Sequence, residues 1–157
     1  CGLTPVYSVD GKFNPDQWRY KPHSQNRLKG EILQNTKATG FRLPTVEEWE
    51  YAAMGGQAYT YSGSTNLDEV GWYEGNSWGR THPVAQKKAN GYGLYDMSGN
   101  VNEWCWDVYP DDRDRRYHCG GSYSHNAFCC GEGHRSYCDA DDQLSDIGFR
   151  IVCSASN

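Results

Sequence analysis

Two carboxylates, Asp96 and Glu103, flank the Gly99-Asn100 pair in a short stretch of the chain. A turn at that pair would let backbone carbonyls converge between the carboxylates, and a donor set made only of oxygen is what a hard cation such as Ca²⁺ requires. The same residues also permit a purely structural arrangement, in which Glu103 pairs with an arginine and Asp96 caps a turn. Both alternatives stay open at this point.

The chain has seven cysteines, an odd number, and no two of them have the CxxC spacing of a zinc ribbon. A structural zinc site is therefore not expected. One or two disulfides would form in an oxidising compartment, but a sequence does not assign their connectivity. His23, His82 and His118 also lack metal-ligand spacing, and we predict that they are surface or packing residues.

Cysteine, histidine, aromatic and small polar residues concentrate between Cys119 and Cys153. The stretch opens on Gly120-Gly121-Ser122 and closes on Ile147-Gly148-Phe149-Arg150, and between these ends it has no helical or strand periodicity. Irregular segments of this length are uncommon in compact domains unless they are functional or disordered. It contains too many aromatics and cysteines for simple disorder. We therefore interpret it as a working surface presented by a rigid scaffold.

The length of 157 residues predicts a single domain, 1–157. The net charge of -5, with scattered Lys and Arg, argues against a nucleic-acid partner, which would call for a basic patch. No apolar run reaches the roughly 18 residues of a membrane helix. Abundant Gly, Trp and Tyr favour a loop-rich fold with large aromatic residues in its core over a helical bundle.

The elements that must position these residues are few. Thr45 is a good N-cap, Glu48 completes a capping box, and Gly55-Gly56 ends the predicted helix, which places Trp49 in the core. Trp104 and Trp106 alternate with Cys105 as in a strand with one buried face. The residues from Asp107 to Arg116 are predicted to form a charged loop.

Four ordered motifs carry a resemblance to a known family. They are Gly-Phe-Arg-Leu-Pro-Thr-x-x-Glu-Trp-Glu-Tyr-Ala-Ala at 40–53, Asn-Gly-Tyr-Gly-Leu-Tyr-Asp-Met-Ser-Gly-Asn-Val-x-Glu-Trp at 90–104, Gly-Gly-Ser at 120–122 and Ile-Gly-Phe-Arg at 147–150. Together they resemble the formylglycine-generating-enzyme (sulfatase-modifying factor) superfamily. The resemblance implies an irregular α+β fold, a variant of the C-type lectin fold, with few helices, short strands and many loops.

The same resemblance makes further expectations specific. It implies a structural Ca²⁺ held by the side chains of Asp96 and Glu103 and the backbone carbonyls of Gly99 and Val101. It also implies that Gly2–Tyr7 matches a segment lying well inside the family's domain, so that an N-terminal portion is missing. Cys1 is then a poor candidate for lipoprotein acylation, although a lipid anchor further upstream remains an option.

The enzymes of this superfamily need two cysteines, five positions apart, shortly after Gly-Gly-Ser. Two nearby thiolates suit copper(I), because soft ligands select that ion. The corresponding positions here hold His125 and Cys130, so one thiol of the pair is absent. We therefore expect no catalytic residues, and a copper-dependent cysteine oxidase is kept as the alternative, together with a module that binds one fixed partner.

A second branch of the superfamily, the variable proteins of diversity-generating retroelements, is more similar to this chain in residues 119–153, called the central stretch below. In that branch, adenines of Asn codons are mutated, which can yield many residue types but not Lys, Glu, Gln, Met or Trp. Glu132 and Gln143 fall on positions that are not Asn in the template-like frame. Fourteen positions match its Asn positions, and all carry reachable residues: Ser124, His125, Asn126, Phe128, Cys129, His134, Ser136, Tyr137, Cys138, Asp139, Asp142, Leu144, Ser145 and Asp146.

These fourteen residues, within a variable region 119–153, are the predicted ligand-binding surface. Aromatic residues and histidines would supply rigid contact area, and the serines and Asn126 adaptable hydrogen bonds, as in antibody loops. Asp139, Asp142 and Asp146 would favour a cationic region on the partner. The expected partner is an unknown protein or other macromolecule, met at a bacterial cell surface or on a phage. No organic cofactor is expected.

Overall fold

The computed structural model describes residues 2–18 and 30–154, and His23 lies outside the described residues. The chain forms two compact units. The smaller one contains the residues up to Arg42 and those from Ile151 onward, and the larger one is Leu43–Arg150. All predicted site residues lie in the larger unit.

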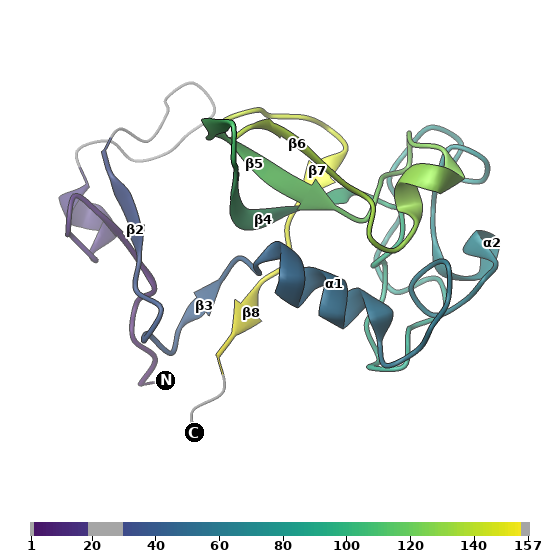
Figure 1. Ribbon diagram of the computed structural model, residues 1–157, viewed down its shortest axis with the longest axis horizontal. Coiled ribbons are helices and arrows are strands. Elements are labelled where there is room, and N and C mark those ends of the chain that lie inside the picture. Colours follow the sequence, from purple (N-terminus) through teal and green to yellow (C-terminus); the bar gives the residue numbers. More distant parts are fainter. Residues whose placement is uncertain (1, 19–29, 155–157) are drawn as a thin grey trace. The chain divides into compact units, whose positions relative to one another are not determined.

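The smaller unit consists of two short antiparallel pairings (Figure 1). Strand β1 (Tyr7–Val9) pairs with β2 (Ile32–Gln34), and β3 (Phe41–Arg42) pairs with β8 (Val152–Cys153). A 3-10 helix, η1 (Pro15–Gln17), follows β1.

The larger unit has one main helix, α1 (Val46–Met54), and its ends are as predicted. The Thr45 hydroxyl accepts from the Glu48 N–H at 3.2 Å, and the Glu48 carboxylate accepts from the Thr45 N–H at 2.9 Å. Gly55 ends the helix in the left-handed region, at φ 58°. Asn90, outside the helix, donates its side-chain amide to the carbonyls of Ala52 and Ala53, and the Ser62 hydroxyl also donates to the Ala53 carbonyl, so carbonyls of the last turn have partners.

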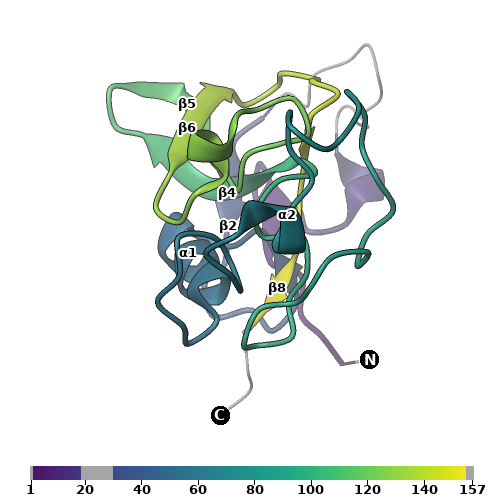
Figure 2. The same cartoon turned by 90° about the vertical axis from the view of Figure 1, so that its right-hand side faces the viewer.

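Helix α1 packs against one face of a four-stranded sheet with strand order β6-β5-β4-β7 (Figures 1 and 2). Strands β4 (Asn102–Tyr109), β5 (Asp112–Cys119) and β6 (Arg135–Asp139) are antiparallel neighbours, whereas β7 (Ile147–Gly148) runs parallel to β4. A short helix, α2 (Leu67–Val70), and a 3-10 helix, η2 (Ala127–Cys130), lie in the long connections.

The expected charged loop from Asp107 to Arg116 is instead the end of the β4–β5 hairpin. Arg113 and Asp114 are exposed residues of strand β5. Because both are charged, the sequence here lacks the alternation of apolar and polar residues that indicates a strand. The 119–153 stretch likewise contains a strand, β6, that the sequence did not indicate. In both places the side chains of the strands are exposed or half-buried. Side chains that do not enter the core need not be apolar, so the sequence shows no alternation of apolar and polar residues there.

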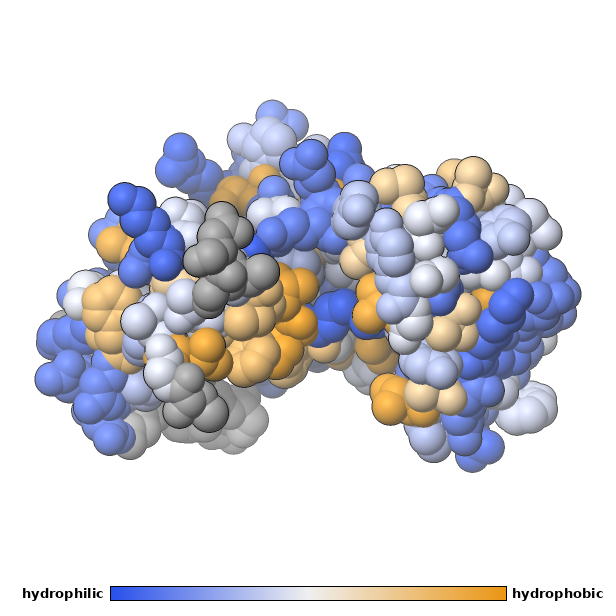
Figure 3. Space-filling model, turned by 90° about the horizontal axis from the view of Figure 1, so that it is seen from below, coloured by the Kyte–Doolittle hydropathy of each residue, from blue (hydrophilic) through white to orange (hydrophobic). Residues whose placement is uncertain are grey.

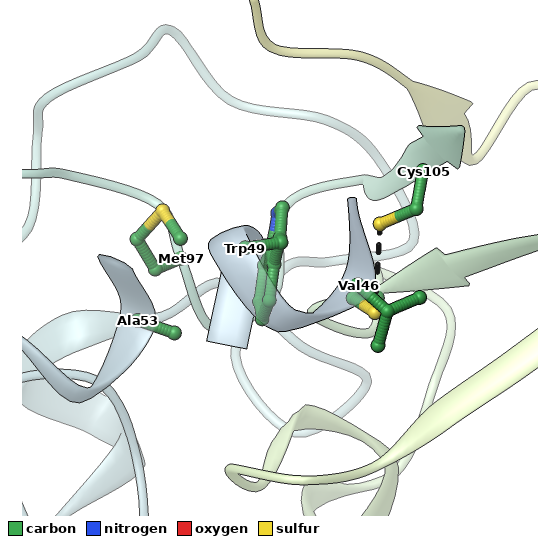
Figure 4. Close-up of a cluster of buried hydrophobic side chains, with 6 residues drawn as sticks. Val46, Trp49, Ala53, Met97 and Cys105 are labelled. Atoms are coloured by element: carbon green, nitrogen blue, oxygen red, sulfur yellow. Dashed lines mark hydrogen bonds between the residues drawn. The ribbon is translucent and has the colours of Figure 1, made fainter. Parts of the chain in front are cut away.

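The core between α1 and the sheet is small (Figure 4). It contains Val46, Trp49, Ala53, Met97, Cys105 and Cys119. The Sγ atoms of Cys105 and Cys119 are 3.8 Å apart, so the two are neighbouring thiols rather than a disulfide. The hydrogen bond between them, together with burial, raises the pKa of the Cys105 thiol. All six cysteines of the described chain are free.

A buried ion pair joins α1, the sheet and the end of the central stretch. Glu103, 6% exposed, accepts from Trp49 Nε1 at 2.7 Å and from Arg150 Nε and Nη2 at 2.6 and 2.8 Å. Arg150 Nη2 also donates to the Tyr95 carbonyl at 3.0 Å. The core therefore includes a carboxylate whose oxygens both receive charge-assisted hydrogen bonds.

Several large apolar side chains remain exposed, among them Ile32 and Leu33 in the smaller unit and Trp78 and Phe149 in the larger. On the face drawn in Figure 3, hydrophobic residues form separate patches among hydrophilic ones. Within residues 2–18 and 30–154, no helix combines the length and hydrophobicity of a membrane span.

Arg150→Met should destabilise the fold by about 3–5 kcal/mol, because it leaves the buried Glu103 charge without its cation. Urea unfolding followed by Trp fluorescence measures this loss. The double variant Glu103→Gln/Arg150→Met should lose less than the sum of the two single variants, since no uncompensated charge remains. Arg113→Met, on the exposed hairpin, is the control and should leave the midpoint unchanged. A loss below about 1 kcal/mol for Arg150→Met would contradict this account.

Candidate functional site

The loop before β4 that carries Asp96 is held in an unusual backbone shape. Asp96 and Asn100 have φ angles of 56° and 66°, and Gly99 has a φ of 83°. A Cβ at Gly99 would lie 2.3 Å from the Trp72 carbonyl oxygen, so this close approach requires glycine. The Asn100 side chain accepts from the His82 N–H and donates to the His82 carbonyl, which locks the loop onto a second one.

The carboxylates of Asp96 and Glu103 line the same hollow, with a volume of about 410 Å³. Asp96 Oδ2 accepts from the Ala85 N–H at 2.8 Å, and Glu103 is paired with Arg150. The structural arrangement expected as one alternative is therefore present. Asp96 Oδ1, however, is buried and has no hydrogen-bond partner within the described residues. A buried carboxylate oxygen without a donor is an atom that a cation would satisfy.

No group of three or more His, Cys, Asp or Glu in the described chain could hold a metal ion. A cation beside Asp96 would therefore need backbone carbonyls, as the expected set with Gly99 and Val101 supplies. Val101 lines the same hollow, whereas Gly99 does not, and both Glu103 oxygens already accept hydrogen bonds from Arg150.

The central stretch is anchored at both sides of its first loop. Ser122 and Cys130 are buried, and Cys130 packs with Leu67 and Val70 of α2. A Cβ at Gly121 would lie 2.6 Å from Cys130 Sγ, so glycine is needed for this anchor.

Between the anchors exposed and half-buried side chains alternate: Ser124, Asn126 and Phe128 are exposed, whereas Ala127 packs against the cluster that contains Cys130. Asn126 caps η2 by accepting from the Cys129 N–H, and Phe128 on η2 is 78% exposed. None of the fourteen predicted positions is buried. Six are half-buried (His125, Cys129, His134, Ser136, Cys138 and Asp146), and the other eight are exposed.

One group of these residues surrounds His118, which is buried on the β5 face opposite α1. Ser136 lies directly across from His118 in the β5–β6 pairing. Burial is the main cause that lowers the pKa of His118 to about 4; the neighbouring imidazoles of His125 and His134 act in the same direction, and Asp146 opposes them. His118 is therefore neutral at pH 7. It is the buried residue beneath a group that includes Ser136, His125, His134 and Asp146. Sequence reasoning classed it as a packing or surface residue without locating it there.

Internal hydrogen bonds hold several members of this group. Asp146 Oδ2 accepts from Ser122 and Ser124 at 3.1 and 3.2 Å. Ser145 bonds the Tyr123 hydroxyl at 3.1 Å, and His125 Nδ1 lies 3.3 Å from Asn102 Nδ2. Burial and nearby Asp142 raise the pKa of Cys138 to about 11, so this thiol stays protonated.

Two predicted residues lie on the other face of the sheet. Tyr137 and Asp139 alternate with Ser136 and Cys138 along β6, and successive strand residues point to opposite faces. Tyr137 stacks on Tyr109 with ring centroids 3.8 Å apart, and Asp139 pairs with Arg115 at 3.2 Å. The fourteen positions are thus accessible but do not form one continuous face.

A second hollow, of about 610 Å³, adjoins Phe128 and His134. Its other walls include Tyr59, Tyr61 and Glu132, which were not among the predicted site residues. The abundance of aromatics in residues 58–84 was visible in the sequence, but nothing there connected that loop to the central stretch.

The positions of the enzymes' cysteine pair differ from a thiolate pair in chemistry as well as in residue type. Cys130 is 1% exposed, and burial raises the pKa of its thiol to about 12. A thiol with that pKa is protonated at neutral pH and is a poor nucleophile. The partner position holds the imidazole of His125.

Two known proteins are similar to this chain in sequence. The chain is 37% identical to the Chaperone protein LppX of Paenibacillus barcinonensis in a gapped alignment of 177 positions that covers 97% of this chain and 62% of LppX. It is 34% identical to the formylglycine-generating enzyme of Streptomyces coelicolor in a gapped alignment of 149 positions that covers 74% of this chain and 48% of the enzyme.

Among solved structures, Treponema denticola variable protein 1 superimposes with a TM-score of 0.83 and 36% identity, covering 96% of this chain and 63% of that protein. The crystal structure of CarF gives a TM-score of 0.78 at 33% identity, over 98% of this chain and 60% of CarF. The chain thus spans less than two thirds of the length of LppX, variable protein 1 and CarF. The expected irregular α+β fold of the formylglycine-generating-enzyme type is confirmed. Residues 11–155 match the Sulfatase-modifying factor enzyme 1-like domain, and the chain belongs to that family.

Proposed function

We propose that this domain is a non-enzymatic ligand-binding module whose surface is carried by residues 124–146. The observation that supports it best is that buried residues fix the two ends of a loop whose middle carries exposed side chains. Ser122 and Cys130 are buried, whereas Ser124, Asn126 and Phe128 between them are exposed. Exposed side chains change at little cost in stability, so such a loop can alter its contacts while its backbone stays in place.

We further infer that the surface is diversified, as in the variable proteins of retroelements. The support is the restriction of residue types at the fourteen positions, together with the similarity to Treponema denticola variable protein 1. Ser124, Asn126, Phe128, Asp142 and Leu144 are exposed and would contribute adaptable contacts. Tyr137 and Asp139 would belong to the sheet's other face and contribute less. The partner in this proposal is a protein met at a bacterial surface or on a phage.

The second candidate is the copper-dependent cysteine oxidase of the same family. It is favoured by the 34% identity to a formylglycine-generating enzyme and by Cys130 at one position of the thiol pair. Against it stand His125 at the other position and the protonated state of Cys130.

A Ca²⁺ ion bound by the side chains of Asp96 and Glu103 and the carbonyls of Gly99 and Val101 is part of the proposal. The unpartnered Asp96 Oδ1 supports it. The ion would stiffen the loop beneath the display surface and supply no reaction chemistry.

The reduced protein mixed with copper(I) and a cysteine-containing peptide should consume no oxygen above background, because the bidentate thiolate site is incomplete. A formylglycine-generating enzyme assayed in parallel is the positive control. Oxygen uptake that depends on this protein, with an aldehyde formed on the peptide, would replace the binding proposal by the oxidase.

A library randomised at Ser124, Asn126, Phe128, Asp142 and Leu144 should remain folded and should yield binders when selected against a panel of unrelated proteins. The control library varies five exposed positions elsewhere in the larger unit: Glu47, Thr65, Gln86, Asp111 and Arg113. If both libraries yield binders equally often, or neither does, residues 124–146 are not a privileged binding surface.

Added Ca²⁺ should raise the melting temperature of the wild-type protein, since a ligand that binds only the folded state stabilises it. Asp96→Asn keeps an acceptor for the Ala85 N–H but removes the charge, and it should abolish the shift. Differential scanning calorimetry at fixed ionic strength, with Mg²⁺ as the comparison ion, measures the effect. An identical response of wild type and Asp96→Asn would rule out this metal site.

A further inference from the structure

The hollow beside Phe128 and His134 contains one acidic group that the display proposal does not use. Glu132 lines it, and the Glu132 N–H donates to the Thr60 carbonyl at 2.9 Å, which fixes the residue against the neighbouring loop. Glu132 Oε1 is buried and accepts no hydrogen bond from any described residue. Burial also raises the pKa of this carboxyl group.

A buried carboxylate oxygen without a donor is costly, and most such atoms in proteins are satisfied by a partner. The ion pairs found in the described chain do not supply one. The nearest arginine in sequence, Arg135, pairs with Glu50 at 3.8 Å, and Arg115 pairs with Asp112 and Asp139. Glu132 therefore has no cationic partner among the described residues, and a cationic group of a bound ligand could pair with it.

The walls of the hollow suit a cation that also has an apolar or planar part. Tyr59 is 41% exposed and Phe128 is 78% exposed, so both offer ring surface to a ligand. Phe128 and His134 meet edge to face, with centroids 5.3 Å apart. Aromatic faces attract guanidinium and ammonium groups, and guanidinium also stacks on them. A volume of about 610 Å³ accommodates such a side chain with room for its neighbours.

We propose that this hollow binds an arginine or lysine side chain of the protein ligand, with the Glu132 carboxylate accepting its N–H groups and Tyr59 and Phe128 flanking its stem. The proposal rests on the proposed binding function and makes it more specific. It differs from the earlier expectation that Asp139, Asp142 and Asp146 attract cations, because those three lie outside this hollow.

The diversification proposal adds a consequence. Glu132 is a residue type that adenine mutation of Asn codons does not produce, whereas Phe128 and His134 stand at positions that would vary. Sister variants would keep the acid and change its walls. They would share a requirement for a basic group and differ in the residues accepted around it.

Titration of the ¹⁵N-labelled protein with N-acetyl-arginine methylamide tests the pocket directly. The amide signals of Thr60, Glu132 and His134 should shift saturably, with a dissociation constant of about 1 mM or weaker, because one side chain buries little surface. The neutral isostere N-acetyl-citrulline methylamide should bind at least tenfold more weakly. Equal binding of the two compounds would overturn the proposal.

Glu132→Gln should reduce the affinity for the arginine compound at least tenfold while its spectrum keeps the wild-type dispersion. Phe128→Ala should weaken binding too, and it removes an exposed ring rather than a core residue. Glu74→Gln is the matched control, because Glu74 is exposed, bonds the His125 carbonyl through its backbone N–H and lies outside the hollow. Unchanged affinity in Glu132→Gln, or shifts centred on Asp142 and Asp146, would refute the pocket.

The two proposals fail separately. The randomised library can yield binders even if Glu132 recognises nothing, in which case only the basic-group preference is lost. If the library fails but the arginine compound binds through Glu132, the hollow is a fixed binding site and the display proposal is lost.

Discussion

The Glu103 carboxylate in the core constrains the rest of the larger unit. Its oxygens accept from Trp49 on α1 and from Arg150 at the end of the central stretch, and Glu103 itself lies on β4. A charge this deeply buried is tolerated only when its partners are all in place. Three segments far apart in the sequence must therefore meet at one point. The long segment between β5 and Arg150, which contains η2 and β6, is fixed to the core at its far end by this ion pair.

Hydrogen bonds from polar side chains hold the loops in place, as apolar packing does between α1 and the sheet. Asn90 satisfies the last carbonyls of α1 and also accepts from the N–H groups of Tyr92 and Leu94. Asn100 binds both backbone groups of His82. Because the core is small, these bonds hold the loops at defined positions, and Asn100 itself lines the hollow beside Asp96. A ligand surface on such loops is ordered without being part of the core.

The family, the capping box of α1 and the strand around Cys105 could be predicted from residue types and motifs, and none of the fourteen central positions is buried. The β4–β5 hairpin and β6 could not be predicted, because their outer residues face solvent and carry no apolar alternation. As a result Tyr137 and Asp139 were grouped with Ser136 and Cys138, although strand geometry turns the two pairs to opposite faces. The arginine partner of Glu103 was one of two open alternatives, since no local pattern links residues 47 positions apart.

The sequence by itself determined helix α1, the strand around Cys105 and the residue types of the central stretch, because caps, turns and family motifs act over short distances. Only the tertiary structure decided which of these residues are neighbours. His118 became the neutral floor of one group, and Glu132 became an unpaired acid in a hollow walled by a loop some seventy residues earlier. The reason is physical: desolvation and the loss of hydrogen-bond partners depend on everything packed around an atom, and most of that comes from distant parts of the chain.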